Sequence, residues 1–128
     1  MKVVDSTFLV DLLRGKEDVS EILDGRELIV TTQINIYEIL KGFFLKRISR
    51  SKFAQVRALF EDIRVLPLDD YGIIRAAEIS SSLQEYGNYV PDCDCLTAGI
   101  ALSKGINTIV TRKGEHFKRM KGIRVEAY

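Results

Sequence analysis

Val3-Val4-Asp5-Ser6-Thr7 decides the fold, because an apolar run changes there into a polar turn and then into a stretch of helical period. Residues 2–5 are expected to form a strand, and residues 7–13 the helix that follows it. The same change recurs along the chain, where short runs rich in Val and Ile alternate with longer stretches whose apolar residues return every three or four positions. This alternation is typical of βαβ units built around a parallel sheet.

The other elements follow from the same pattern. Further strands are expected over 27–31, 64–68, 106–111 and 123–127. Further helices are expected over 33–47, 51–62, 71–86 and 91–104, with Gly87 and Gly105 ending the last two. Right-handed crossovers would assemble these elements into a three-layer α/β/α sandwich with a central parallel sheet. Binding sites in such sheets lie outside the carboxyl ends of the strands.

Length and composition limit the kinds of protein this can be. The chain has 128 residues, 46% of them apolar and 29% charged, so we expect one compact domain over residues 1–128. No stretch approaches the ~20 apolar residues that a membrane span needs, and Asp5 interrupts the N-terminal apolar run before a signal peptide could form. Cys93 and Cys95 are too close to join distant segments, which favours reduced thiols. These features predict a cytoplasmic protein.

Acidic and basic stretches alternate along the chain, although the net charge is only +1. Residues 1–40 hold eight acids and four bases, whereas residues 41–60 hold six bases and no acid. Residues 61–100 are acidic again, and residues 112–124 hold six bases against Glu115 alone. Either these stretches are solvated helix faces, or the fold gathers carboxylates in one place and offers cations beside them to a phosphate backbone.

Two acidic residues follow the first two predicted strands. Asp5 lies where the first strand meets its helix, so it either caps that helix or places a carboxylate at the functional edge of the sheet. Glu38 sits within an apolar helix one turn before Gly42, and a glycine there suggests the close approach of another segment. The alternative is an exposed Glu38 paired with Lys41 or Lys46.

Asp92 and Asp94 begin the helix over 91–104, where the helix dipole favours acids whatever their function. Asp94 shares one helix face with small residues, namely Thr97, Ala98 and Ala101. Such a face lets the helix pack closely on the sheet and would carry Asp94 towards Asp5.

Carboxylates of Asp5, Glu38 and Asp94 that converged would repel one another and raise their pKa values unless a cation neutralised them. A hard divalent ion, Mg²⁺ or Mn²⁺, takes such oxygen ligands and can activate water against a phosphodiester. The three positions therefore predict a metal-dependent phosphodiesterase site.

Four segments of the chain resemble the PIN domain. They are Val-Val-Asp5-Ser-Thr-Phe-Leu-Val-Asp-Leu-Leu, Ile-Tyr-Glu38-Ile-Leu-Lys-Gly, Asp94-Cys-Leu-Thr-Ala-Gly-Ile-Ala-Leu and Ile-Val-Thr111-Arg-Lys-Gly-Glu-His-Phe. In order and spacing they are most similar to the VapC-type ribonuclease toxins of prokaryotic toxin–antitoxin pairs. The resemblance implies an acidic Mg²⁺ site formed by Asp5, Glu38 and Asp94. It also implies single-stranded RNA cleavage, a homodimer, and neutralisation by a small VapB-like antitoxin whose C-terminal segment enters the active groove.

The chain departs from the family after the fourth predicted strand, where Lys113 stands at a position that usually carries Asp or Asn. Glu115 could replace that ligand, or Lys113 could bind the scissile phosphate; Asp92 and Thr111 are further possible members of the site. The cations expected on the RNA backbone are Lys41, Lys46, Arg47, Arg112 and Lys113.

Two other functions stay open. Lys113 could leave a catalytically impaired module that binds RNA or antitoxin without cleavage. Alternatively, Asp5, Thr111 and Lys113 loosely match the acid, hydroxyl and lysine of a receiver-like phosphoacceptor domain, in which Asp69 would accept the phosphate.

Other residues are expected to serve the structure. His116, the only histidine, is expected to pack or to lie on the surface rather than to act as a base. Aromatic residues at helical spacing are expected in the core or at a dimer interface; they are Tyr37, Phe43, Phe44, Phe53 and Phe60.

Overall fold

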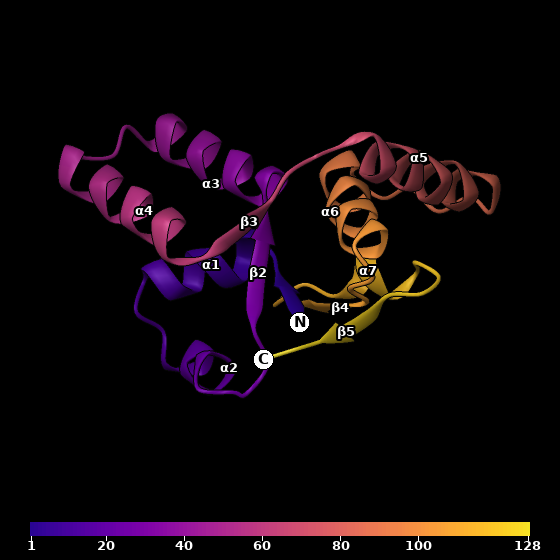
Figure 1. Cartoon of the computed structure of the whole chain (residues 1–128). Coiled ribbons are helices and arrows are strands. Elements are labelled where there is room, and N and C mark those ends of the chain that lie inside the picture. Colours follow the sequence, from indigo (N-terminus) through magenta and orange to yellow (C-terminus); the bar gives the residue numbers. More distant parts are fainter.

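The computed structural model describes the chain from Met1 to Tyr128. Its centre is a parallel sheet of five strands in the order β3-β2-β1-β4-β5 (Figure 1). The strands are β1 (Lys2–Val4), β2 (Ile29–Thr32), β3 (Arg64–Leu66), β4 (Thr108–Val110) and β5 (Arg124–Glu126). The chain builds outward from β1 to β3 and then returns to add β4 on the other side of β1. Such a reversal leaves a crevice at the carboxyl ends of β1 and β4.

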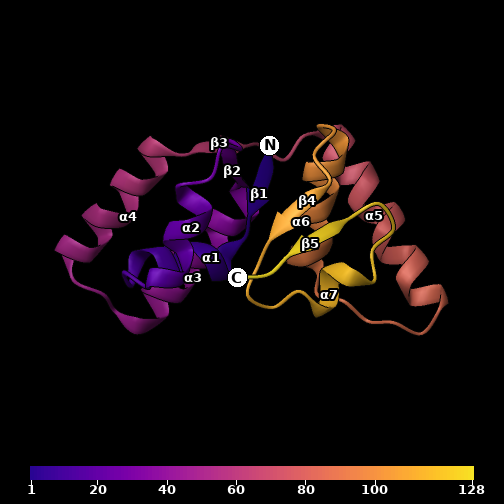
Figure 2. The same cartoon turned by 90° about the horizontal axis from the view of Figure 1, so that it is seen from below.

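Helices cover both faces of the sheet. The helices α1 (Ser6–Leu13), α3 (Gln33–Lys46) and α4 (Arg50–Asp62) pack on one face, with η1 (Glu17–Val19) and α2 (Ser20–Leu23) nearby. The helices α5 (Asp70–Glu85), α6 (Asp92–Ser103) and α7 (Glu115–Lys118) pack on the other. Figure 2 shows the two groups on opposite sides of the strands. The predicted three-layer α/β/α sandwich is therefore confirmed.

Alternation of side chains along the strands divides the core in two. Val3 and Ile109 belong to the cluster under α5, α6 and α7, whereas their neighbours Val4 and Val110 belong to the cluster under α1, α3 and α4. Successive side chains of a strand point to opposite faces, so each central strand contributes to both clusters. Val3 pairs with Ile109 and Val4 with Val110 in the register of β1 and β4, so the paired side chains of the two strands point to the same face of the sheet.

The structure adds three short helices that the sequence did not predict, namely η1, α2 and α7. Each is about one turn long, so too few residues repeat to give a periodic pattern. The expected ends of α5 and α6 are confirmed, because Gly87 and Gly105 follow them with φ of 73° and 75°, the left-handed conformation that closes a helix. No helix is both long and apolar enough to span a bilayer.

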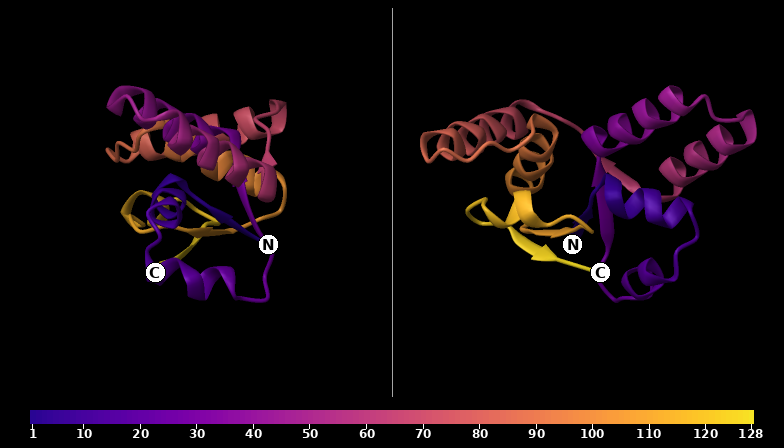
Figure 3. Two further views of the ribbon diagram at one scale, coloured as in Figure 1. Left: turned by 90° about the vertical axis from the view of Figure 1, so that its left-hand side faces the viewer. Right: turned by 180° about the vertical axis from the view of Figure 1, so that it is seen from behind.

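The hairpin formed by α3 and α4 projects away from α5 (Figure 3).

The strand order excludes the receiver-like alternative. Receiver-like sheets follow the order 2-1-3-4-5, whereas this sheet places β2 between β1 and β3. Asp69, the residue that would have accepted the phosphate, instead caps α5 through Gly72 N, and its Oδ2 lies 2.6 Å from Lys104 Nζ. Asp69 therefore has a structural role at the start of α5.

Candidate functional site

Asp5 lies at the carboxyl end of β1, in the crevice between β1 and β4. Its side chain is 5% exposed and accepts hydrogen bonds from Thr111 Oγ1 at 2.5 Å, Thr7 Oγ1 at 2.6 Å and Phe8 N at 3.2 Å. Burial raises the pKa of Asp5, and these three hydrogen bonds offset only part of that effect. Asp5 therefore caps α1, as one expectation had it, and is also a buried carboxylate at the edge of the sheet. Its functional role stays a prediction.

Glu38 reaches the same edge from the second turn of α3. Thr32 ends β2 and caps this helix by accepting from Asn35 N, which fixes where Glu38 lies relative to the sheet. Burial is the main cause that raises the pKa of Glu38, followed by the negative charge of Asp94 and, more weakly, that of Asp5. The Ser6 hydroxyl and Lys41 act in the opposite direction. Glu38 is thus a half-buried carboxylate under the electrostatic influence of the other two candidates.

Asp94 comes from the first turn of α6 and completes the predicted trio. Its Oδ2 lies 2.7 Å from His116 Nδ1, and both side chains are partly exposed. His116 belongs to α7, the short helix that sequence patterns did not predict, so its contact with Asp94 was missed as well. The histidine fixes one oxygen of Asp94 and leaves the other, Oδ1, without a protein partner.

The chemistry of these three side chains fits a hard divalent ion. Burial is the main cause that raises the pKa of Asp5 and Glu38, and the charge of Asp94 adds to the rise of both, which is a repulsion that a bound cation relieves. Carboxylate oxygens are also the ligands that Mg²⁺ and Mn²⁺ prefer. No three His, Cys, Asp or Glu side chains lie close enough together to form a ready-made metal-binding group. The three-ligand metal site thus stays a prediction.

The other possible members of the site differ in their surroundings. Thr111 is fully buried and joins Asp5 to the loop after β4, where Lys113 N donates to Thr111 Oγ1 at 3.1 Å. Asp92 and Glu115 are exposed, and neither side chain makes a hydrogen bond or ion pair. The side chain of Lys113 is also exposed. Of this group, only Thr111 touches one of the three carboxylates.

A buried polar network behind the carboxylates joins three elements. Asn35 on α3 is 1% exposed; its Oδ1 accepts from Thr32 Oγ1 at 2.7 Å, and its Nδ2 donates to Thr97 Oγ1 of α6 at 3.4 Å. The network holds α3 and α6, which carry Glu38 and Asp94, at a fixed separation. Sequence analysis did not identify it, although an Asn within an apolar helix could have indicated it.

A second buried carboxylate, Asp11, ties the end of the chain to α1. Asp11 is 1% exposed and accepts from Tyr128 Oη at 2.7 Å, while Arg112 Nη1 and Lys16 Nζ lie 3.3 Å and 3.5 Å from its Oδ1. Burial alone would raise the pKa of Asp11, but the Tyr128 hydrogen bond and the two positive charges outweigh it and lower the pKa. Arg112, expected on the RNA backbone, is therefore held by Asp11 beside the carboxylate site.

The remaining expected RNA-binding cations lie on and after α3. Lys41 is close enough to lower the pKa of Glu38, while Lys46 lines a cavity that Glu38 also lines. Arg47 follows α3 as its C-cap residue and lines a separate hollow towards α4. The expectation of a close approach at Gly42 is wrong, because a Cβ at that position would meet no atom within 4 Å. Gly42 instead lines the same cavity as Glu38 and Lys46.

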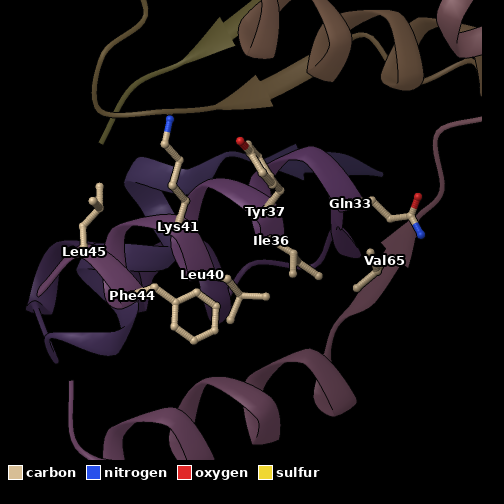
Figure 4. A pocket seen from close by; sticks show the side chains of 8 residues that line it. All are labelled: Gln33, Ile36, Tyr37, Leu40, Lys41, Phe44, Leu45 and Val65. Carbon is tan, nitrogen blue, oxygen red and sulfur yellow. The ribbon is translucent and has the colours of Figure 1, made fainter. Parts of the chain in front are cut away.

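A larger cavity, of about 830 Å³, lies on the opposite face of α3 and contains none of the candidate carboxylates (Figure 4). Tyr37 and Phe44 on this face are 56% and 67% exposed, so they do not occupy the core, the first of the two places expected for them. Phe43 and Phe60 do pack against the core cluster under α1, α3 and α4. A dimer interface on the exposed face stays a prediction.

Comparison with known proteins identifies a family that this chain matches. The model of the PIN domain matches residues 2–123. Among solved structures, VapBC2 of Rickettsia felis, bound to a DNA fragment from its promoter, superposes with a TM-score of 0.87 at 16% identity over 99% of this chain and 98% of the other. DNA-bound VapBC of Salmonella typhimurium gives 0.84 at 25% identity over 98% and 96%. VapC20 of Mycobacterium tuberculosis, a sarcin-ricin loop cleaving toxin, gives 0.73 at 14% identity over 97% and 99%. A search of curated protein sequences finds no match.

Proposed function

The chain belongs to the PIN-domain family, and on that basis we propose that it is a Mg²⁺-dependent, single-strand-specific endoribonuclease acting as the toxin of a type II toxin–antitoxin pair. The observation that supports this best is that Asp5, Glu38 and Asp94 come from three separate elements around one edge of the sheet, where burial raises the pKa of Asp5 and Glu38 and the negative charge of Asp94 adds to that rise. Buried carboxylates that repel one another in this way are costly unless they serve a cation.

Asp5, Glu38 and Asp94 would hold the ion, and Mg²⁺ is the proposed species. When bound, a divalent ion supplies charge stabilisation and an acidified water for phosphodiester hydrolysis. Asp5 contributes a carboxylate whose position Thr7 and Thr111 fix. The raised pKa of Glu38 suits it to accept a proton from an attacking water. His116 holds one oxygen of Asp94 and leaves the other for the ion.

The cations around the carboxylates would bind the RNA backbone. Lys41 and Lys46 lie along α3 beyond Glu38, and Arg112 and Lys113 follow β4 beyond Thr111. Phosphate contacts of this kind position a nucleic acid without reading its sequence. Arg112 differs from the others in having a carboxylate partner, since its Nη1 lies 3.3 Å from Asp11 Oδ1.

Protein partners form part of the proposal. Two of the similar solved structures are VapBC assemblies, in which toxin and antitoxin occur together. We therefore propose a small VapB-like antitoxin for this chain; the homodimer is proposed from the resemblance of its sequence to the VapC-type toxins. An antitoxin gene beside the coding sequence would support the toxin assignment.

Conservative substitution of the carboxylates tests the activity. Asp5→Asn and Asp94→Asn are expected to reduce Mg²⁺-dependent cleavage of single-stranded RNA by at least about a hundredfold, the scale of a lost metal ligand or its support, and to weaken Mn²⁺ binding measured by calorimetry. Asp92→Asn is the matched control, since it lies on the same helix turn but is exposed and unpaired. Undiminished cleavage in both Asp5→Asn and Asp94→Asn would refute the proposed site.

The same assay separates the nuclease from the impaired module that Lys113 suggested. A wild-type protein that binds RNA but cleaves none with Mg²⁺ or Mn²⁺ would favour the binding module. Because the Lys113 side chain is exposed and contacts none of the three carboxylates, we favour the nuclease.

A further inference from the structure

A cavity of about 230 Å³ opens between α1, α3 and α4, with Glu38 in its wall. Three cations line it, one from each side: Arg14 after α1, Lys46 at the end of α3 and Lys52 in α4. Half of its lining is apolar, including Leu13 and Phe43. The cavity thus combines an apolar wall with a cationic rim and begins at one of the three candidate metal ligands.

The spacing of residues along α3 keeps this cavity open. Glu38, Gly42 and Lys46 follow one another at intervals of four, so they form a single line along the helix. A Cβ at Gly42 would meet no atom within 4 Å, so the space over the middle of this line is empty. Glycine costs about 1 kcal/mol relative to Ala inside a helix, and no close packing here compensates for that cost. What Gly42 provides is room between a carboxylate and an ammonium group.

The charges around the cavity favour an anion. Arg14, Lys46 and Lys52 take part in none of the ion pairs of the molecule, which involve other cations. Glu38 is the only acid in the lining. The cavity is also smaller than the roughly 300–1,000 Å³ pockets that hold drug-sized molecules. It therefore suits one compact anionic group with a small apolar part.

We propose that this cavity is a subsite for the nucleotide next to the scissile phosphodiester of single-stranded RNA. Lys46, Lys52 and Arg14 hold that nucleotide's phosphate, and its sugar lies against the apolar wall. Gly42 gives the backbone its passage from the carboxylates to the cations. The inference rests on the proposed nuclease function and adds Arg14, Gly42 and Lys52 to its binding residues.

RNA binding without cleavage tests the subsite. Affinity of the full chain for a fluorescein-labelled single-stranded RNA is measured in EDTA over a range of salt concentrations. Lys52→Ala and Arg14→Ala are each expected to weaken binding about five- to tenfold and to reduce the salt slope by about 0.7, the contribution of one phosphate contact on a single strand. Arg57→Ala is the matched control, since it removes an exposed cation of α4 outside the cavity and should leave the affinity unchanged.

Gly42→Leu tests the same subsite without removing a charge. Leucine is a good helix former and points into free space, so the melting temperature should stay the same or rise while RNA affinity falls at least tenfold. Wild-type affinity in Gly42→Leu and Lys52→Ala would overturn the subsite and leave the nuclease proposal intact, provided that the wild type still cleaves RNA.

Two further outcomes separate the remaining possibilities. A wild-type protein that neither binds nor cleaves RNA would defeat the proposed function itself. Binding of polyglutamate but not RNA, with loss in Lys52→Ala, would identify an acidic peptide as the occupant and overturn the RNA subsite.

Discussion

The helices on the two sides of the sheet differ most between α6 on one side and α3 and α4 on the other. In α6, six of twelve residues are buried, and a Cβ added at Gly99 would lie 2.6 Å from Ala76 N and 2.7 Å from Gly72 O of α5. In α3, only two of fourteen residues are buried, and in α4 only one of thirteen. Cavities flank α3 on both faces. One layer is therefore closed by backbone contact between helices, while the other keeps volume and charge available to a ligand.

The two layers therefore have different roles, since the closed layer supports the site and the open layer is available to bind a ligand. Asp94 is carried by the closed layer, Glu38 by the open layer, and Asp5 by the sheet between them. The rigid layer fixes one carboxylate and the polar network through Asn35 and Thr97 sets the distance to the other. A site between the two layers can admit a chain-like substrate from the open side while the closed layer keeps its carboxylate in place.

Substitution of two mid-helix glycines should give the largest change in stability that tests this contrast. Gly99→Ala is expected to destabilise the protein by about 3 kcal/mol, because its methyl group would overlap backbone atoms of α5 that cannot move independently. Gly42→Ala should instead stabilise it by about 1 kcal/mol, because the new methyl group meets nothing and Ala favours the helix. Urea unfolding of both variants against wild type measures the pair. Equal effects of the two substitutions would show that the layers do not differ in packing.

These two helices also show which packing contacts could be predicted from sequence patterns. The small residues Thr97, Ala98 and Ala101 on the face of Asp94 correctly predicted that the helix over 91–104 packs on the sheet, since all three are buried. The contact of Gly99 with α5 was not predicted. The same argument failed at Gly42, where the absence of a side chain leaves space. A glycine in a helix indicates that a side chain is disfavoured at that position. Only the tertiary structure shows whether another segment packs against the glycine, as at Gly99, or whether the space is open, as at Gly42.

The fold was predicted more fully than the site. Strand and helix patterns gave the parallel sheet and both layers, since each long element carries its own periodicity. The contact of His116 with Asp94 depends on a helix of one turn, and the cluster around Asp11 joins residues 117 positions apart, Asp11 and Tyr128. Such contacts follow from tertiary geometry that no local pattern encodes. An acid within the apolar run of α1 was the one available signal for Asp11.

Asp11 provides the second test, because it is a carboxylate used for structure in the open half of the molecule. Asp11→Ala should cost about 2 kcal/mol at neutral pH, since it leaves the Tyr128 hydroxyl and two cations without their buried partner. The pKa of Asp11 is lowered in the folded protein, so its contribution is present above the ordinary carboxyl pKa and is lost as the pH falls through the lowered value. Unfolding of variant and wild type from pH 7 to below pH ~4 should therefore converge at the acidic end.

Asp18→Ala is the control for this test, because Asp18 on η1 is exposed and forms no ion pair. Its effect should stay within about 0.5 kcal/mol at every pH. A constant difference between Asp11→Ala and wild type across the pH range would mean that packing, and not charge, accounts for the loss.

Glu38 should respond to pH in the opposite direction and with the smallest change in stability. Its pKa is raised in the folded protein, so the native state binds this proton more tightly than the unfolded chain does, and wild-type stability falls as the pH rises from the ordinary carboxyl pKa through the raised value. Glu38→Gln removes that charge and should raise the melting temperature slightly at pH 7, with the gain disappearing near pH 4, where wild-type Glu38 is itself protonated. Calorimetric melting at both pH values measures the gain. If Glu38→Gln melted below the wild type at pH 7 in the absence of metal ions, Glu38 would be a stabilising residue like Asp11, and its burial beside Asp94 would no longer point to a cation.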